Sequence, residues 1–197
     1  IDGRTRPDPT TTGLVSWKRH EIEYQMDNAV ALGYSGDVPD CSFADWGEEK
    51  LNRIYVGTGY KKDAAGFWKS KHWGNANYSD LIKYLLFVGG YDIISTGNQA
   101  DLVHTMGPIA RSVRDPGYNV MVSSLEDSLT LVSQSKVYVG NDTGMMHVAA
   151  AAGCRTIGLF LLDNSIVKSK PWGKDALAIA LVGKQIEADE LLRYIYQ

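Results

Sequence analysis

Residues 141–153 have a composition that suits the binding of an anion. Asn, Asp and Thr, which commonly cap helices, precede Gly144 and an alanine-rich stretch that ends at Gly153. The first N–H groups of this helix, from Thr143, Gly144 and Met145, would face open space, and the helix dipole favours negative charge there. Because Gly144 has no side chain, it leaves room for the anion to approach. An ordinary capped helix is the alternative interpretation.

Two side chains of the same segment are candidates for the site. Asp142 stands where a helix cap is expected, so its oxygen atoms should face backbone N–H groups and stay weakly basic. His147 falls on the first turn and can point into the same cleft, although a lone histidine is more often structural. The sequence contains no Asp-x-Asp pair to hold a divalent ion, so it predicts neither a metal nor another cofactor.

A glycine-flanked threonine and a lysine follow the first predicted strand. Thr58 stands between Gly57 and Gly59, but no clear helix begins after Tyr60, so a dinucleotide-binding fingerprint is not supported. Lys71 lies further along, before the next helix. Beside a phosphate-binding loop it would serve as a point charge for phosphate oxygens. A solvated basic turn is the alternative.

Polar residues also follow the next two predicted strands. Gln99 and Asp101 stand where an acidic or amide side chain often contacts ribose hydroxyl groups in α/β sheets. Ser124 and Asp127 have the spacing of a helix cap, with Leu125 between them. For the second pair, a plain cap without a role in binding is the favoured interpretation.

These loops follow an alternation of strands and helices that begins at residue 50. Short β-branched or aromatic segments predict strands at residues 53–56, 92–95, 119–122, 136–139, 156–160 and 178–182. Helical patterns occupy residues 78–88, 101–113, 125–133, 145–152 and 188–196. The alternation predicts an α/β fold, with a Rossmann-like parallel sheet and helices on both faces. In such sheets ligands bind at the carboxyl ends of the strands.

The first 49 residues lack the alternation of strand and helix patterns that the rest of the sequence shows. Residues 1–13 form an irregular lead-in, and apolar positions in residues 17–32 predict a helix that ends at Gly33. We therefore expect two parts: a lead-in with a joining helix over residues 1–49, and one domain over residues 50–197.

Composition excludes several classes of protein. The 197 residues are 44% hydrophobic and 22% charged, which is typical of a globular chain and not of a disordered one. Twenty basic and 23 acidic residues give a net charge of −3, so no basic field for nucleic acid is expected. No apolar stretch reaches the roughly 20 residues of a transmembrane helix. The two cysteines, Cys41 and Cys154, predict no disulfide framework and fit a reducing cytoplasm.

Taken together, the loops resemble the donor-binding half of glycosyltransferase family 9, the heptosyltransferases of lipopolysaccharide core synthesis. The resemblance covers residues 17–197, and its most specific motif is the stretch 141–153; Lys71-His72-Trp73 and Ser124-Leu125-Glu126 also match. It implies a GT-B fold with two Rossmann-like domains, of which this chain carries the carboxy-terminal one. It also implies inverting transfer of a heptose-like sugar from a nucleoside-diphosphate donor, ADP-linked, to lipopolysaccharide or another glycan or lipid-linked acceptor.

The resemblance also implies roles for individual residues. Thr143, Gly144 and Met145 would offer N–H groups to the pyrophosphate, with help from Thr58 and Lys71. Met121 and Leu125 would flank the adenine. Gln99 and Asp101 are the candidates for the acidic ribose-binding position of the family. The family's catalytic aspartate lies in its amino-terminal domain, so this chain is not expected to contain it; through such a domain the protein would be peripheral to the inner membrane.

Two other functions remain open from the sequence. A stand-alone, non-catalytic nucleotide-sugar-binding module would carry the same loops. An epimerase with the same two-domain fold is less favoured, since its acid and base would lie in both halves.

Overall fold

A computed structural model describes residues 20–37, 50–59, 71–162, 165–173, 175–181, 186 and 188–196. Its centre is a six-stranded sheet in the order β3-β2-β1-β4-β5-β6, and each pair of neighbouring strands is parallel. The strands are β1 (Leu51–Gly57), β2 (Asp92–Gly97), β3 (Tyr118–Val122), β4 (Ser135–Asn141), β5 (Arg155–Phe160) and β6 (Ala176–Ala180). This confirms the predicted parallel α/β sheet. The last strand lies two residues earlier than predicted, and Val182 is outside the described residues.

The described helices lie between these strands in the chain, except α1, which precedes the first strand, and α8, which follows the last. They are α1 (Glu21–Ala31), α2 (Asn75–Val88), α3 (Gln99–Asp101), the π-helical turn η2 (Leu102–Met106), α4 (Gly107–Val113), α5 (Leu125–Ser133), α6 (Gly144–Ala151), α7 (Ser165–Ser169) and α8 (Ala188–Ile195). The helices predicted from residues 78, 125, 145 and 188 are confirmed with small shifts at their ends. The short helix α7 had not been predicted.

The helix predicted over residues 101–113 is interrupted by the wider turn η2. Pro108 follows this turn and has no backbone N–H, so it cannot bond the carbonyl group of His104 as an α-helix requires. That carbonyl group instead accepts a hydrogen bond from Asn75 Nδ2 at 3.1 Å. The proline thus explains the irregularity, and a side chain of α2 satisfies the freed backbone group.

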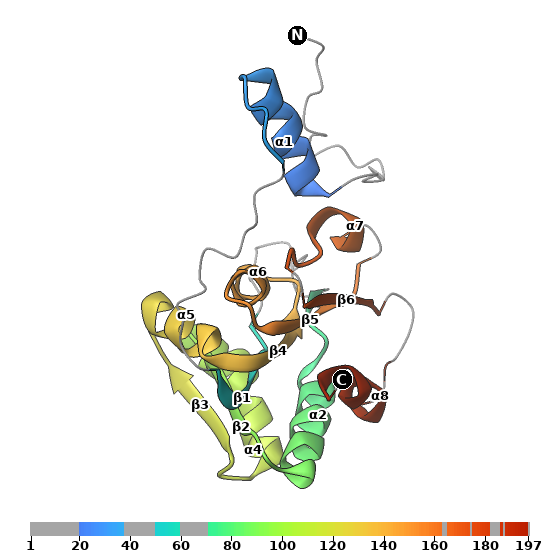
Figure 1. Ribbon diagram of the computed structural model, residues 1–197. Helices are drawn as coiled ribbons and strands as arrows, with labels where there is room; N and C mark the ends of the chain where they lie inside the picture. Colours follow the sequence, from blue (N-terminus) through green and yellow to red (C-terminus); the bar gives the residue numbers. More distant parts are fainter. Residues whose placement is uncertain are drawn as a thin grey trace.

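Helices cover both faces of the sheet, as Figure 1 shows. On one face, α2, α4 and α8 enclose a core with Ile54, Leu81 and Leu191 at its centre. On the other face, α5 and α6 pack on Tyr55, Tyr138 and neighbouring residues. Burial on both faces is the reason for the nearly continuous apolar strands.

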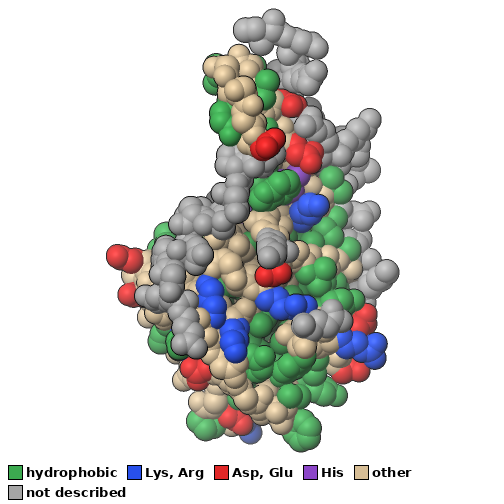
Figure 2. Space-filling view, in the orientation of Figure 1, with side chains coloured by type: hydrophobic (Ala, Val, Ile, Leu, Met, Phe, Trp, Pro, Cys, Tyr) green, Lys and Arg blue, Asp and Glu red, His purple; other side chains and the backbone are tan. Residues whose placement is uncertain are grey.

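Helix α1 lies outside the sheet and projects from the body of the molecule (Figures 1 and 2). His20 caps its start, because His20 Nδ1 accepts from the Ile22 N–H at 3.1 Å. His20 Nε2 lies 2.9 Å from the carbonyl oxygen of Lys170, and Glu21 lies 3.9 Å from Lys168 Nζ. These contacts join the start of α1 to the segment around α7. The predicted lead-in, residues 1–13, and residues 17–19 of the predicted joining helix lie outside the described residues.

Candidate functional site

A cavity of about 440 Å³ opens at the carboxyl ends of the central strands. Its lining comes from β1 and β2, from the loops after β1, β2, β3 and β4, and from the starts of α5 and α6. Strands β1 to β3 are added toward one edge of the sheet and β4 to β6 toward the other, so the strand order reverses between β1 and β4. The crevice at such a switch point is where ligands bind in open α/β sheets. The cavity therefore lies where the fold predicts a ligand.

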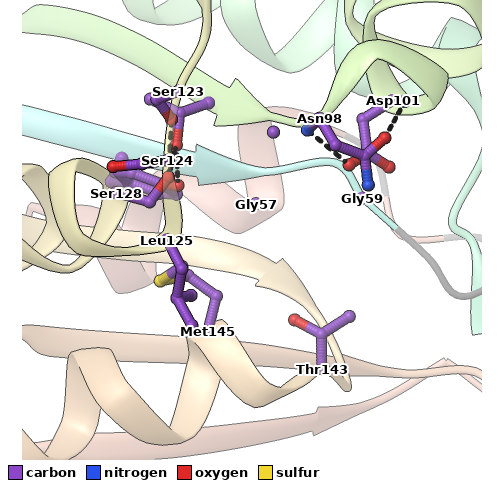
Figure 3. A pocket seen from close by; sticks show the side chains of 13 residues that line it. Gly57, Gly59, Asn98, Asp101, Ser123, Ser124, Leu125, Ser128, Thr143 and Met145 are labelled. Atoms are coloured by element: carbon purple, nitrogen blue, oxygen red, sulfur yellow. Dashed lines mark hydrogen bonds between the residues drawn. The ribbon is translucent and has the colours of Figure 1, made fainter.

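One side of the cavity is the loop between β2 and α3. Asn98 and Asp101 form a capping box: Asn98 Oδ1 accepts from the Asp101 N–H at 3.1 Å, and Asp101 Oδ2 accepts from the Asn98 N–H at 3.0 Å. A Cβ atom on Gly97 would lie 2.7 Å from Asp101 Oδ2, so only glycine leaves room for this carboxylate. Figure 3 shows Asn98, Asp101 and Gly59 together at this end. Asp101 lines the cavity, whereas Gln99, the other candidate of this loop, is exposed and does not.

A second side is a chain of four hydroxyl groups. Tyr55 Oη lies 2.6 Å from Thr96 Oγ1, which lies 2.7 Å from Ser128 Oγ; the latter is also 2.7 Å from Ser123 Oγ. All four residues line the cavity. Because each hydroxyl both donates and accepts, the chain can reorient its hydrogen atoms toward a polar ligand. No local spacing in the sequence points to Tyr55, Thr96 or Ser128, because the bonds join residues of different strands and helices.

Ser124 and Leu125 complete this second side (Figure 3). Ser124 Oγ accepts from the Asp127 N–H at 3.0 Å, so the predicted helix cap is confirmed. Leu125 is 71% exposed, and its apolar surface at the rim offers a flat group a place to pack. Met121, at the end of β3, is exposed but does not line the cavity.

The third side is the start of α6, with Thr143 and Met145 facing the cavity from opposite the loops after β2 and β3 (Figure 3). Thr143 is the N-cap, yet its side chain makes no capping hydrogen bond. Gly144 is exposed, and a Cβ atom placed there would meet nothing within 4 Å. The first N–H groups of this eight-residue helix therefore border open space, as an anion site requires.

Lys71 and Asp142 form an ion pair beside the cavity. Lys71 Nζ lies 2.5 Å from Asp142 Oδ2, and the side chains are only 16% and 7% exposed. Ser169 Oγ lies 3.4 Å from the other oxygen of Asp142. The prediction that Asp142 caps the helix is wrong: the cap is Thr143, because a lysine 71 positions earlier reaches the carboxylate and pairs with it.

His147 belongs to the same charged group and does not line the cavity. Burial lowers its pKa; Asp142 opposes this shift, whereas His20 and Lys71 add to it. The imidazole is therefore held toward its neutral form, which can both donate and accept a hydrogen bond.

Asn141 connects the cavity wall to the start of α2. Its side chain is fully buried. Asn141 Oδ1 accepts from the Trp73 N–H at 3.1 Å and from the Tyr78 hydroxyl at 2.8 Å, while Nδ2 donates to the carbonyl groups of Thr58 and Gly59 at 3.4 and 3.2 Å. From the sequence alone, Asn141 is only a residue type that caps helices, since these partners lie more than 60 positions away.

The structure thus separates the predicted site residues into two groups. The first group lines the cavity: Asp101, Ser124, Leu125, Thr143 and Met145. The second group lies at its rim or behind its walls: Thr58, Lys71, Gln99, Met121, Asp142, Gly144 and His147. Thr58 is in the second group because its side chain is buried and faces Thr105, with 3.5 Å between the two hydroxyl oxygens.

The sequence of residues 49–190 matches the family described as glycosyltransferase family 9 (heptosyltransferase). The chain belongs to glycosyltransferase family 9. The resemblance inferred from the stretch 141–153 and the loops is therefore confirmed. Comparison with curated protein sequences gives no match.

Solved structures of this family share the fold. The E. coli heptosyltransferase WaaC with ADP superposes with a TM-score of 0.72 at 19% identity, over 92% of this chain and 57% of that one. A family 9 glycosyltransferase from Veillonella parvula DSM 2008 gives 0.70 at 16% identity, over 98% and 61%. E. coli ADP-heptose lps heptosyltransferase II gives 0.58 at 20% identity, over 89% and 50%. The chain thus spans about half to three fifths of the length of these relatives.

The residues that the structure describes contain neither a metal-binding cluster nor a membrane-spanning helix. In that part of the chain, no three His, Cys, Asp or Glu side chains are grouped so that they could hold a metal ion. Within the same residues, no helix combines the length and the apolar character needed to cross a bilayer.

Proposed function

We propose that this chain binds the nucleoside-diphosphate sugar donor of a family 9 glycosyltransferase in the cavity beside α6. The observation that carries the proposal is the open start of α6 at the wall of a switch-point cavity, where Thr143, Gly144 and Met145 can offer N–H groups to a diphosphate. In this proposal residues 50–197 form the donor-binding domain, and residues 1–49 are the lead-in and the segment that joins it to a further domain.

The other sides of the cavity suit the rest of a nucleotide. Asp101 and Asn98 offer polar atoms for ribose hydroxyl groups, while Leu125 and the nearby Met121 give apolar surface for a base. The solved relative WaaC carries ADP, and this favours an ADP-linked, heptose-like donor. Gln99, exposed beside Asp101, is within the same loop and is the second candidate for ribose contact.

Lys71, Thr58, Asp142 and His147 would act from behind the cavity wall. Paired with Asp142, Lys71 contributes less positive charge than a free ammonium group, so the helix start must supply more of the attraction for the diphosphate. The same oriented N–H groups would stabilise the departing nucleoside diphosphate, which needs no proton or metal for this effect. Thr58 holds the loop after β1 in place.

Transfer with inversion also requires a base that deprotonates the acceptor hydroxyl. Asp142 is a poor candidate because its carboxylate is buried against Lys71. We therefore propose that the base, an aspartate, and the binding of a glycan or lipid-linked acceptor come from another domain. The buried free thiol of Cys154 fits a cytoplasmic location.

Calorimetry with ADP, UDP and GDP tests the binding proposal and identifies the nucleobase that the cavity prefers. Gly144→Val is the informative variant: its backbone is unstrained and the space around it is open, so the chain should fold while the branched side chain blocks the phosphate. We expect at least tenfold weaker binding of the preferred nucleotide. Equal binding by parent and variant would contradict the site.

A transfer assay separates the enzyme from the non-catalytic module. We expect the 197-residue chain to bind the donor without transferring it, because orientation of the acceptor alone can contribute roughly 7–11 kcal/mol and no acceptor site is proposed here. Turnover at an ordinary enzyme rate would show that a complete catalytic site lies within the chain. A supplied amino-terminal family 9 domain that restores transfer would favour the enzyme over the module.

A further inference from the structure

The hydroxyl group of Tyr138 lies at the carboxyl edge of the sheet, directly behind the cavity wall. The side chain is fully buried between β4 and the helices α5 and α6. Gly57 and Gly140 face each other in the β1–β4 register, and a Cβ atom on either would overlap the Tyr138 hydroxyl oxygen; on Gly140 it would lie 2.7 Å away. The two glycines therefore make room for this hydroxyl group at the switch point.

Tyr138 Oη has no hydrogen-bond partner among the residues that the structure describes. Burial raises the pKa of Tyr138, so the group remains a protonated hydrogen-bond donor, and the nearby Thr143 hydroxyl partly opposes this shift. The Thr143 hydroxyl is close enough to act on Tyr138 but does not reach normal hydrogen-bond geometry. A buried hydroxyl group without a partner is destabilising and needs an explanation.

Thr143 connects this buried hydroxyl to the cavity. It lines the cavity, and as N-cap of α6 it uses its side chain for no capping bond. The Thr143 hydroxyl therefore lies at the wall without a capping role, and the unpaired Tyr138 hydroxyl lies behind it. If the Thr143 hydroxyl hydrogen turns toward an anion at the start of α6, the Thr143 oxygen is left to accept from Tyr138.

We propose that Tyr138 is a positioning residue for the diphosphate: on binding, its hydroxyl donates to Thr143 Oγ1, and the Thr143 hydroxyl donates to a phosphate oxygen. This inference rests on the proposed donor site and adds a residue to it. Hydrogen bonds in such a relay strengthen one another, because each donor becomes more polarised. In the ligand-free protein the Tyr138 hydroxyl is thus a donor without an acceptor, and binding of the diphosphate turns Thr143 so that it becomes that acceptor.

Tyr138→Phe removes only the hydroxyl group, and it tests the relay in two measurements. Calorimetry with ADP, and separately with inorganic pyrophosphate, should show about fivefold weaker binding, the usual effect of one hydrogen bond. The unfolding temperature without ligand should stay unchanged or rise, since no bond is lost in the free protein. Tyr118→Phe is the matched control: it loses a 2.9 Å bond to Ser95 away from the cavity, so its unfolding temperature should fall while its affinity is kept.

A double-mutant cycle with Thr143→Val decides whether Tyr138 acts through Thr143. In the Thr143→Val background, Tyr138→Phe should have no further effect on binding. Additive effects, parent-like binding by Tyr138→Phe, or a loss of ligand-free stability like that of Tyr118→Phe would each overturn the relay while leaving the donor site intact. Failure of the parent chain to bind either ligand would overturn the donor site and the relay together.

Discussion

The cavity and the charged group around Asp142 border the same loop, 141–143, but offer a ligand different interactions. The cavity is lined by hydroxyl groups and N–H groups, and the carboxylate among its described lining residues, Asp101, is engaged in a helix cap. The charged group holds Lys71, Asp142 and His147 behind the wall, with lysine and aspartate neutralising each other. In the proposed donor site, oriented dipoles would therefore face the diphosphate, whereas the full charges lie behind the wall and pair with each other.

Removing Lys71 should have the largest effect on stability, because it eliminates the buried ion pair with Asp142. Lys71→Met leaves the Asp142 carboxylate largely buried without its ammonium partner, and we expect the free energy of unfolding to fall by about 3 kcal/mol. Nucleotide binding should weaken too, because a negative charge then lies beside the anion site. Denaturant titration measures the first effect and calorimetry the second.

Lys83→Met is the control for this prediction. Lys83 and Asp80 form an exposed pair with 3.6 Å between nitrogen and oxygen, so its loss should change stability by less than about 1 kcal/mol. If Lys71→Met were as mild as Lys83→Met, the wall would not depend on the buried pair.

Asn141 joins the two sides, and its removal should loosen both. Asn141→Leu leaves the Trp73 N–H without its acceptor and frees the carbonyl groups of the loop after β1, at a cost of about 2 kcal/mol in unfolding free energy. Hydrogen exchange should report faster opening of residues 57–59. Asn119→Leu, at an exposed position of β3, should leave both measurements near those of the parent.

Ser128 lies in the middle of the hydroxyl chain that lines the cavity. Ser128→Ala interrupts the hydroxyl chain between Thr96 and Ser123. Thr96 keeps its bond to Tyr55, and Ser123 lines the cavity, where water can bond it, so stability should fall by only about 1 kcal/mol. Nucleotide affinity should fall a few-fold if the chain faces the ligand. Thermal unfolding and calorimetry on the same sample give both values. An unchanged affinity would mean that the four hydroxyl groups have only a structural role.

Local patterns in the sequence were enough to predict the sheet and four of the described helices, those that begin near residues 78, 125, 145 and 188. Short β-branched or aromatic segments predicted all six strands, and the spacing of Ser124 and Asp127 predicted the cap of α5. The start of α6 at Gly144 followed from glycine after cap-forming residues. These features depend on neighbours within a few positions, which a sequence displays directly.

The polar contacts behind the cavity could not be predicted, because they join residues far apart. Lys71 and Asp142 are 71 positions apart, and the hydroxyl chain joins residues of β1, β2 and α5. No local spacing encodes such pairs; the parallel order of β2, β1 and β4 creates them. The role of Tyr138 is hidden for the same reason, since a buried tyrosine in a strand is read as core.

The smallest predicted effect is a pH dependence that comes from His147. Burial lowers the pKa of this imidazole below the usual 6.5, so the unfolded chain binds more protons than the folded one between the two pKa values. The contribution of neutral His147 to the free energy of unfolding is therefore fully present above pH 6.5, and it is lost as the pH falls through the lowered pKa. Asp142 limits the loss, whereas Lys71 and His20 increase it. Unfolding measured from pH 7.5 to 5 should show a shallower decline for His147→Gln than for the parent. Parallel curves would mean that His147 titrates alike in both states, and that the charged group does not hold it neutral.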